Sequence, residues 1–176
     1  MYYRKGVNIK NMENKFIKQS LPAIANKHSK ILILGSLPGD KSIKEKEYYY
    51  NPSNQFWKII YSIFGKKEDV PQLYEEKIKF LYEHDIALWD VYSHAERKNS
   101  ADENITAEEF NNIKTLLINY PTIKKILLNG KKAQKGFEKY IVENDIDCEY
   151  EYVPSSSSAH AINHLEKVEC WKKAII

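Results

Sequence analysis

Four short segments of the sequence carry glycine, amide, carboxylate or hydroxyl groups that suit the binding of a polar ligand. The first, 35–39 (GSLPG), has two glycines and a proline, which let the backbone approach a ligand closely. Asp90 closes an apolar run, where an acid is seldom a core residue, and Asn129 precedes a glycine. The fourth, 154–160 (PSSSSAH), offers four hydroxyls and several backbone N–H groups, which can contact phosphates. Each segment also has a plainer interpretation as a turn or a polar loop.

An aromatic segment, 48–57 (YYYNPSNQFW), follows the first of these motifs. Aromatic rings beside a glycine-rich turn can line a slot for a flat ring, since bases stack on aromatic faces. Phe56 is a candidate for such stacking, and its alternative is the core of the helix beginning there, where we place Trp57. Asn54 is either a ligand-facing amide or the N-cap of that helix, because Asn is a favoured N-cap residue.

The elements that must position these groups follow from the hydrophobic pattern. The predicted strands are 30–34, 86–91, 125–128 and 149–153, of which the first three are nearly continuous apolar runs typical of a buried parallel sheet. The predicted helices are 56–63, one opened by a capping box at 106–109, one that includes 133–141, and 163–173. This alternation predicts an α/β fold, a three-layer α/β/α sandwich with a mainly parallel four-stranded sheet. The carboxyl ends of its strands are the expected ligand site.

Length and composition set the wider bounds. The 176 residues fit one domain, which we place at 21–176 after a polar N-terminal extension, 1–20. No apolar run approaches the roughly 20 residues that span a bilayer, and the polar start lacks a secretory signal, so we expect a cytoplasmic protein. The net charge of +3 is compatible with a polyanionic partner without requiring one. Two cysteines are too few for a four-cysteine zinc or iron–sulfur site, and we expect no metal.

Taken together, the motifs resemble the uracil-DNA glycosylase superfamily, and their order and spacing are most like its hypoxanthine (deoxyinosine) DNA glycosylase branch. The resemblance extends over about 21–171 and rests on the segments 35–39, 49–57, 87–91, 128–130 and 154–160. It implies a four-stranded parallel sheet between helices. It also implies a monofunctional DNA repair enzyme that flips a deaminated base, most of all hypoxanthine, and excises it hydrolytically. No metal or organic cofactor is needed for that reaction, and the expected partner is DNA, bound by a monomer.

Two positions depart from the best-known uracil enzymes. Where those enzymes have an Asp or Asn that positions the attacking water, this chain has Leu37. Where they have a His that stabilises the departing base, it has Val153. The hypoxanthine branch shares the first departure, which favours that branch over a strict uracil enzyme.

The resemblance and the pocket chemistry suggest roles for the polar residues. We expect Asn54 to orient the water, with Asn51 in reserve, and Phe56 to stack on the flipped base. Asn129 and Asp90 would read the edge of the base, and Asn129 is the stronger candidate because an amide offers both a donor and an acceptor.

The remaining expected site residues act through backbone and loop contacts. Residues of the first motif would form the pocket floor: Gly35, Ser36, Leu37 and Pro38. The serine-rich loop would grip phosphates, with its last two residues nearest the gap in the duplex: Ser155, Ser156, Ser157, Ser158, Ala159 and His160. His160 is alternatively a solvated loop histidine.

Three other functions remain open at the level of sequence. The nearest is a mismatch-specific uracil or thymine DNA glycosylase, whose Pro-x-Asn-x-Phe-Trp element is similar to residues 52–57. A second is a catalytically inactive protein that binds damaged DNA, because Leu37 has no polar side-chain atom. A third is an unrelated nucleotide-binding α/β protein.

Overall fold

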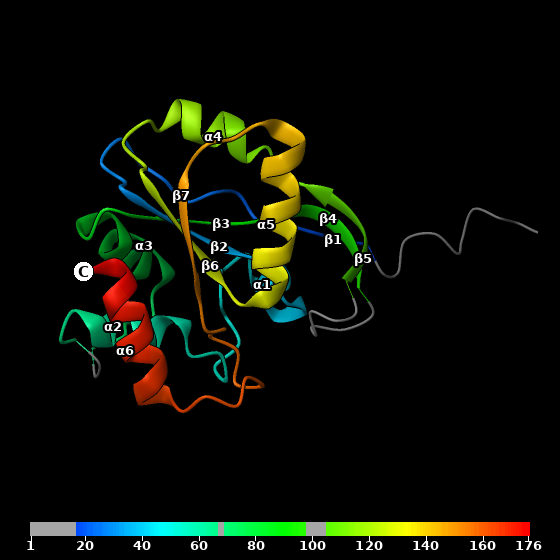
Figure 1. The fold of residues 1–176 in the computed structure, drawn as a ribbon. Helices are drawn as coiled ribbons and strands as arrows, with labels where there is room; N and C mark the ends of the chain where they lie inside the picture. Colours follow the sequence, from blue (N-terminus) through cyan, green and yellow to red (C-terminus); the bar gives the residue numbers. More distant parts are fainter. Residues whose placement is uncertain (1–16, 67–68, 98–104) are drawn as a thin grey trace, which may run out of the picture.

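The computed structural model describes residues 17–66, 69–97 and 105–176 (Figure 1). Its central sheet has four parallel strands in the order β3-β2-β6-β7. These are β2 (Ile31–Gly35), β3 (Ile86–Asp90), β6 (Lys125–Asn129) and β7 (Glu149–Val153). All four were predicted from the sequence to within about one residue at each end.

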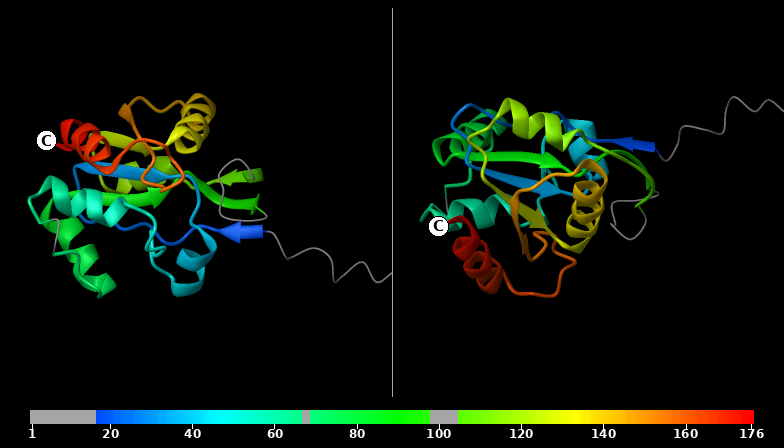
Figure 2. Two further views of the ribbon diagram at one scale, coloured as in Figure 1. Left: turned by 90° about the horizontal axis from the view of Figure 1, so that it is seen from below. Right: turned by 45° about the horizontal axis from the view of Figure 1, so that its top comes forward.

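Helices cover both faces of this sheet. They are α1 (Asp40–Glu45), α2 (Phe56–Ile63), α3 (Tyr74–Glu83), α4 (Ile113–Asn119), α5 (Lys131–Asn144) and α6 (His164–Ile175). Figure 2 shows these layers from two further directions, with α6 alongside α2. In the described part of the chain, no helix is long and apolar enough to cross a bilayer.

The central strand β2 shows how the sequence builds the layers. Ile33 packs with residues of α2, α3 and α6, whereas Leu32 and Leu34 pack with residues of α4 and α5. None of these three side chains is exposed to solvent. Successive strand residues point to opposite faces, so a continuous apolar run serves two cores at once. The predicted three-layer α/β/α sandwich is confirmed.

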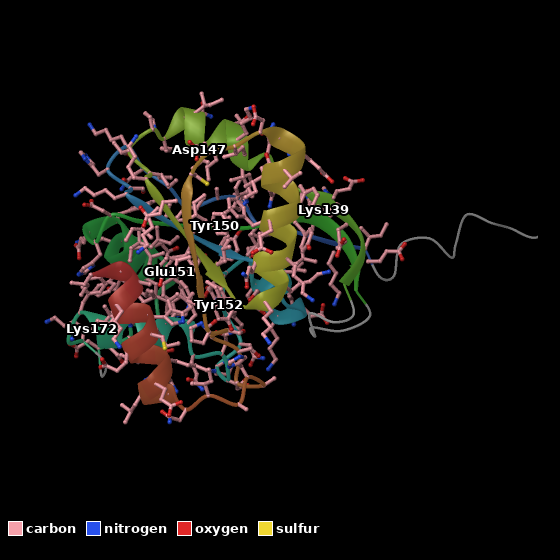
Figure 3. All side chains as sticks on the ribbon, in the orientation of Figure 1. Lys139, Asp147, Tyr150, Glu151, Tyr152 and Lys172 are labelled. Atoms are coloured by element: carbon pink, nitrogen blue, oxygen red, sulfur yellow. The ribbon has the colours of Figure 1, made fainter. Side chains whose placement is uncertain are left out.

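The strand β7 lies at one edge of the sheet, which explains its mixed composition. Figure 3 shows Tyr150, Glu151 and Tyr152 along it. Glu151 forms an ion pair with Lys125 of β6, at 3.0 Å between Nζ and Oε2. Tyr150 packs edge-on against Phe137, with 5.4 Å between ring centroids. An edge strand with charged side chains is protected against pairing with other chains.

A second sheet was not predicted. It is antiparallel, with the order β1-β4-β5, and consists of β1 (Ile17–Gln19), β4 (Tyr92–Arg97) and β5 (Ile105–Phe110). The strand β1 pairs with β4, so the ordered fold begins before Leu21, within the segment assigned to the extension. The rest of that extension, 1–16, lies outside the described residues.

The capping box at 106–109 was assigned to a helix wrongly. These residues lie in β5, where Thr106 pairs with Glu96 of β4. The helix α4 starts later, and its cap is Asn112, whose side chain accepts a hydrogen bond from the Thr115 N–H at 3.0 Å. Antiparallel pairing with β4, the preceding strand, outweighs the local helix signal.

Candidate active site

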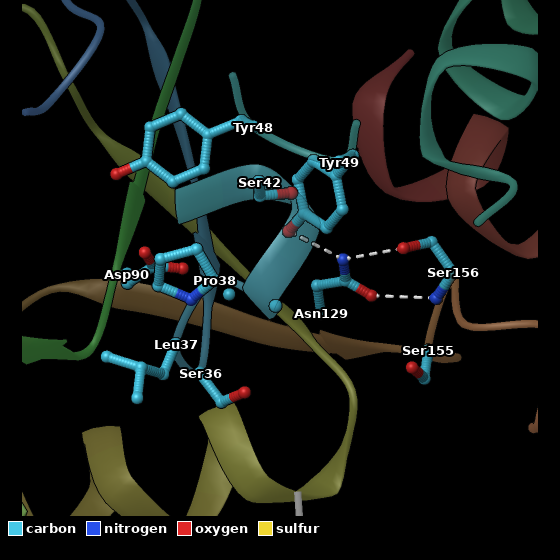
Figure 4. Close-up of a pocket in the computed structure, with 12 residues that line it drawn as sticks. Ser36, Leu37, Pro38, Ser42, Tyr48, Tyr49, Asp90, Asn129, Ser155 and Ser156 are labelled. Carbon is cyan, nitrogen blue, oxygen red and sulfur yellow. Dashed lines mark hydrogen bonds between the residues drawn. The ribbon is translucent and has the colours of Figure 1, made fainter. Parts of the chain in front are cut away.

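A small polar cavity of about 80 Å³ lies at the carboxyl ends of β2, β3 and β6, beside the loop that follows β7 (Figure 4). This is the edge of the sheet where the sequence placed the ligand site. The cavity is lined by Gly35, Ser36, Leu37, Pro38, Gly39, Ser42, Tyr48, Tyr49, Asp90, Asn129, Ser155 and Ser156. The four polar segments singled out in the sequence therefore meet at one place.

Gly35 allows two polar groups to converge over the end of β2. A Cβ atom at this position would lie 2.7 Å from Asp90 Oδ1 and 2.9 Å from the Tyr49 hydroxyl oxygen. Asp90 is buried, with 3% exposure, and is the one carboxylate among the described residues that line the cavity. Its Oδ2 accepts a hydrogen bond from the Ser20 hydroxyl at 3.0 Å. The absence of a side chain at Gly35 thus leaves the carboxylate and the hydroxyl facing the same space.

The amide of Asn129 is held by three hydrogen bonds (Figure 4). Its Nδ2 donates to the Tyr49 hydroxyl at 2.9 Å and to the Ser156 hydroxyl at 3.0 Å. Its Oδ1 accepts from the Ser156 N–H at 2.9 Å. Both N–H hydrogens are therefore used within the protein, and only the carbonyl oxygen retains hydrogen-bonding capacity. The expectation that this amide offers a base both a donor and an acceptor does not hold in this conformation.

Tyr49 is the important residue that the sequence reading did not single out. Its φ is +55°, a left-handed conformation that costs a bulky residue about 1–3 kcal/mol. Its ring stacks on Phe56, with 4.0 Å between centroids and 15° between planes. Phe56 itself is fully buried and does not line the cavity. The aromatic ring that reaches the cavity is therefore that of Tyr49, and Phe56 packs against it in the core.

Asn51 and Asn54 lie outside the cavity. They line a neighbouring groove of about 890 Å³, whose wall also includes Tyr49. Asn54 Oδ1 accepts the N–H of Phe56 at 2.9 Å, so its side chain does bond to the start of α2, although Gln55 occupies the N-cap position. Asn51 Oδ1 accepts the N–H of Ser53 at 3.2 Å. The structure does not bring either amide together with Asp90 and Asn129.

The serine-rich loop divides into an inner and an outer half. Ser155 and Ser156 line the cavity, and Ser156 is almost fully buried by its bonds to Asn129. Ser156 is therefore not available to grip a phosphate, contrary to expectation. Ser158 and Ala159 are exposed at the outer end. His160 is partly buried, and its Nδ1 has no hydrogen-bond partner in the described part of the chain.

Tyr48, which lines the cavity, and the partly buried Tyr74, which bonds to the Tyr48 N–H, remain protonated over the physiological range. Burial, with a smaller contribution from the Asp90 charge, raises the pKa of Tyr48 well above its usual value. Burial likewise raises the pKa of Tyr74 to about 12. The Tyr48 hydroxyl donates to the Leu21 carbonyl at 2.8 Å. Among the described residues, no cluster of three or more His, Cys, Asp or Glu side chains is arranged to hold a metal ion.

The family model of the Uracil DNA glycosylase superfamily matches residues 22–176. The chain belongs to the uracil DNA glycosylase superfamily. The chain departs from the best-known uracil enzymes of that superfamily at two positions. The structure places an apolar side chain at both. Leu37 lines the cavity with 6% exposure, and Val153 is buried in the core with 1% exposure.

Relatives place it more closely within the superfamily. A curated protein of Methanosarcina acetivorans named hypoxanthine DNA glycosylase is 38% identical over 145 residues, covering 82% of this chain and 89% of that protein. Another of the same name, from Methanosarcina barkeri, is 40% identical over 117 residues, covering 66% of this chain and 73% of that protein. A solution NMR structure from M. acetivorans, of a protein provisionally assigned to uracil DNA glycosylase, has a TM-score of 0.77 and 34% identity. The match covers 90% of this chain and 96% of that chain.

Proposed function

We propose that this protein is a DNA N-glycosylase that flips a deaminated base out of the helix and hydrolyses its N-glycosidic bond, with hypoxanthine as the preferred base. One observation carries the proposal. A chain of this superfamily, akin to hypoxanthine DNA glycosylases over most of its length, holds a polar cavity at the strand ends where an amide, a carboxylate and a tyrosine hydroxyl converge.

The base would enter the cavity over the backbone of Gly35, Ser36, Leu37 and Pro38. Tyr49 would stack on its face, because Tyr49 lines the cavity and is supported from behind by Phe56. Asn129 Oδ1 would accept the N1–H of hypoxanthine, since this oxygen keeps a lone pair after bonding to Ser156. This contact would recognise the edge of the base, whereas the negative charge that develops on the departing base needs hydrogen-bond donors.

The attacking water would be held in one of two places, the groove beside the cavity or the cavity itself. Asn54 remains our first choice, with Asn51 in reserve, because its amide lies on the wall of the groove that adjoins the cavity through Tyr49. Asp90 is the second candidate, because its carboxylate lines the cavity and is oriented by the Ser20 hydroxyl. A carboxylate can both orient a water and favour the cationic sugar of the transition state.

The proposal also covers the assembly and its location. We propose a monomer acting on DNA, as the resemblance to the hypoxanthine glycosylase branch implies. We propose a cytoplasmic location, in keeping with relatives named as DNA glycosylases.

Incubation with end-labelled duplexes tests the proposal. Four duplexes carry deoxyinosine, deoxyuridine, a G·T pair or an unmodified control at the same position, and alkaline cleavage then reveals abasic sites. We expect the strongest cleavage with deoxyinosine and none with the control. Faster cleavage of deoxyuridine or of the G·T pair would favour a uracil or thymine mismatch enzyme instead. Binding to these duplexes without cleavage of any would favour the inactive damage-binding alternative.

A further inference from the structure

We propose that Lys167 of α6 is a positioning residue for DNA binding: it holds the turn at 157–160 so that the turn presents a backbone N–H to a phosphate of the DNA. This inference rests on the proposed function, because it takes DNA as the ligand. It concerns a residue of the last helix, outside the motifs considered above.

Lys167 is unusual because its side chain is buried although it carries a charge. Its exposure is zero, and its Nζ donates to the carbonyl oxygen of Ser157 at 2.8 Å. It forms no ion pair within the described ranges. Burial lowers the pKa of this amine, as expected when an ammonium group loses water. Lysine is almost never fully buried without a partner, so this placement calls for a role.

The carbonyl that Lys167 holds also closes a tight turn. The Ser157 oxygen accepts the His160 N–H at 3.2 Å, which makes Ser158 and Ala159 the tip of the turn. Both tip residues are exposed. The turn lies in the loop that joins β7 to α6 (Figure 1).

The hydrogen bond to the Ser157 carbonyl also fixes the direction of the next N–H in the chain, that of Ser158. No peptide bond in the described structure is cis, and in a trans peptide the N–H points opposite to the C=O. Because Lys167 and His160 bind the Ser157 carbonyl from inside, the N–H of Ser158 points outward. That N–H makes no hydrogen bond to the described residues. Backbone N–H groups at such positions are common phosphate contacts.

The charge of Lys167 should also strengthen the Ser158 N–H as a donor. A positive charge directly behind a carbonyl polarises the peptide and makes its N–H a stronger donor toward an anion, much as charge-assisted hydrogen bonds exceed neutral ones. The same loop is tied to the cavity one residue earlier, where Ser156 fixes Asn129. Lys167 therefore sets the outer half of a loop whose inner half shapes the base pocket.

Two substitutions separate these effects. Lys167→Gln keeps a donor for the Ser157 carbonyl but removes the charge, and Lys167→Met removes both. Lys172→Met, an exposed lysine on the same helix, is the matched control. Two quantities are measured for each protein: the dissociation constant for a duplex with an uncleavable abasic-site analogue, and the single-turnover excision rate at saturating inosine duplex. Thermal melts confirm folding, and the Gln variant serves if the Met variant does not fold.

We expect affinity to fall about tenfold in the Gln variant and further in the Met variant, by more than any fall in the saturated rate. The control should bind like the wild type. The dissociation constant is also measured for duplexes in which one phosphate at a time is replaced by an uncharged methylphosphonate. At one phosphate, neutralisation should weaken wild-type binding about tenfold and weaken Lys167→Gln much less, because that contact is already impaired.

Equal losses at every phosphate in the wild type and in Lys167→Gln would overturn the inference, as would variants that bind like the wild type. A fall confined to the saturated rate would also overturn it, since it would mean that Lys167 merely supports the pocket. These failures differ from failure of the proposed function, in which the wild-type protein would excise nothing.

Discussion

A methyl group at Gly35 tests whether the cavity is the site of reaction. The Cβ of Gly35→Ala would lie 2.7 Å from Asp90 Oδ1 and 2.9 Å from the Tyr49 hydroxyl oxygen, whereas ordinary contact begins at 3.4 Å. The carboxylate must then retreat by about 0.7 Å and the hydroxyl by about 0.5 Å, the shortfalls from that contact distance. Misplacement on the order of 1 Å can cost about 10²-fold in rate. We therefore expect excision of hypoxanthine to slow about 10²-fold.

The assay is single-turnover excision from an inosine duplex, measured beside a thermal melt. Crowding of this kind costs about 1–3 kcal/mol of stability, which in a domain of this size lowers Tm by a few degrees. Gly136→Ala is the matched control, because its Cβ would lie 2.4 Å from the Tyr92 hydroxyl oxygen, outside the cavity lining. The control should lose stability and keep the wild-type rate. A Gly35→Ala protein that excises at the wild-type rate would refute the assignment of the cavity.

Three further outcomes are expected. Asn54→Ser should keep a bond to the Phe56 N–H two residues on, since a Ser hydroxyl can make the same turn as Asn. It should still excise about 10²–10⁴-fold more slowly if Asn54 orients the water. An unchanged rate would shift the role to Asn51 or to Asp90, tested with Asn51→Ser and Asp90→Asn. Excision should survive an excess of EDTA, and a loss restored by a divalent ion would contradict a metal-independent reaction. The dissociation constant for DNA should rise steeply between about 50 and 200 mM salt, because phosphate contacts release counterions; a flat titration would count against phosphate gripping.

The parallel sheet was predictable because its signal is local. Largely apolar runs such as 31–34 and 125–128 indicate buried strands even when the neighbouring strand is unknown. The sheet β1-β4-β5 gave no such signal, because its strands include polar stretches such as 92–97 (YSHAER). Those strands form by pairing with one another, β1 with the distant β4 and β4 with the following β5, and the capping box within β5 pointed to a helix.

The location of the site was predictable, and the orientation of its side chains was not. Asp90 and Asn129 end neighbouring parallel strands, so the sheet alone brings them to one edge. The stacking role given to Phe56 failed for a different reason. Tyr49 adopts a left-handed φ that turns its ring over Phe56, and no spacing in the sequence specifies a residue that adopts a strained conformation.

The serine-rich loop shows why one residue type can carry two roles. Adjacent serines make different contacts: the side chain and N–H of Ser156 bond to Asn129, whereas Ser157 offers its carbonyl to Lys167 at the base of an exposed turn. The two contacts share one stretch of backbone, so the exposed tip at Ser158 and Ala159 cannot shift far without moving the group that fixes the pocket amide. Correct placement of the DNA backbone and correct alignment of Asn129 should therefore be achieved together, which would restrict excision to bases delivered from a properly bound strand.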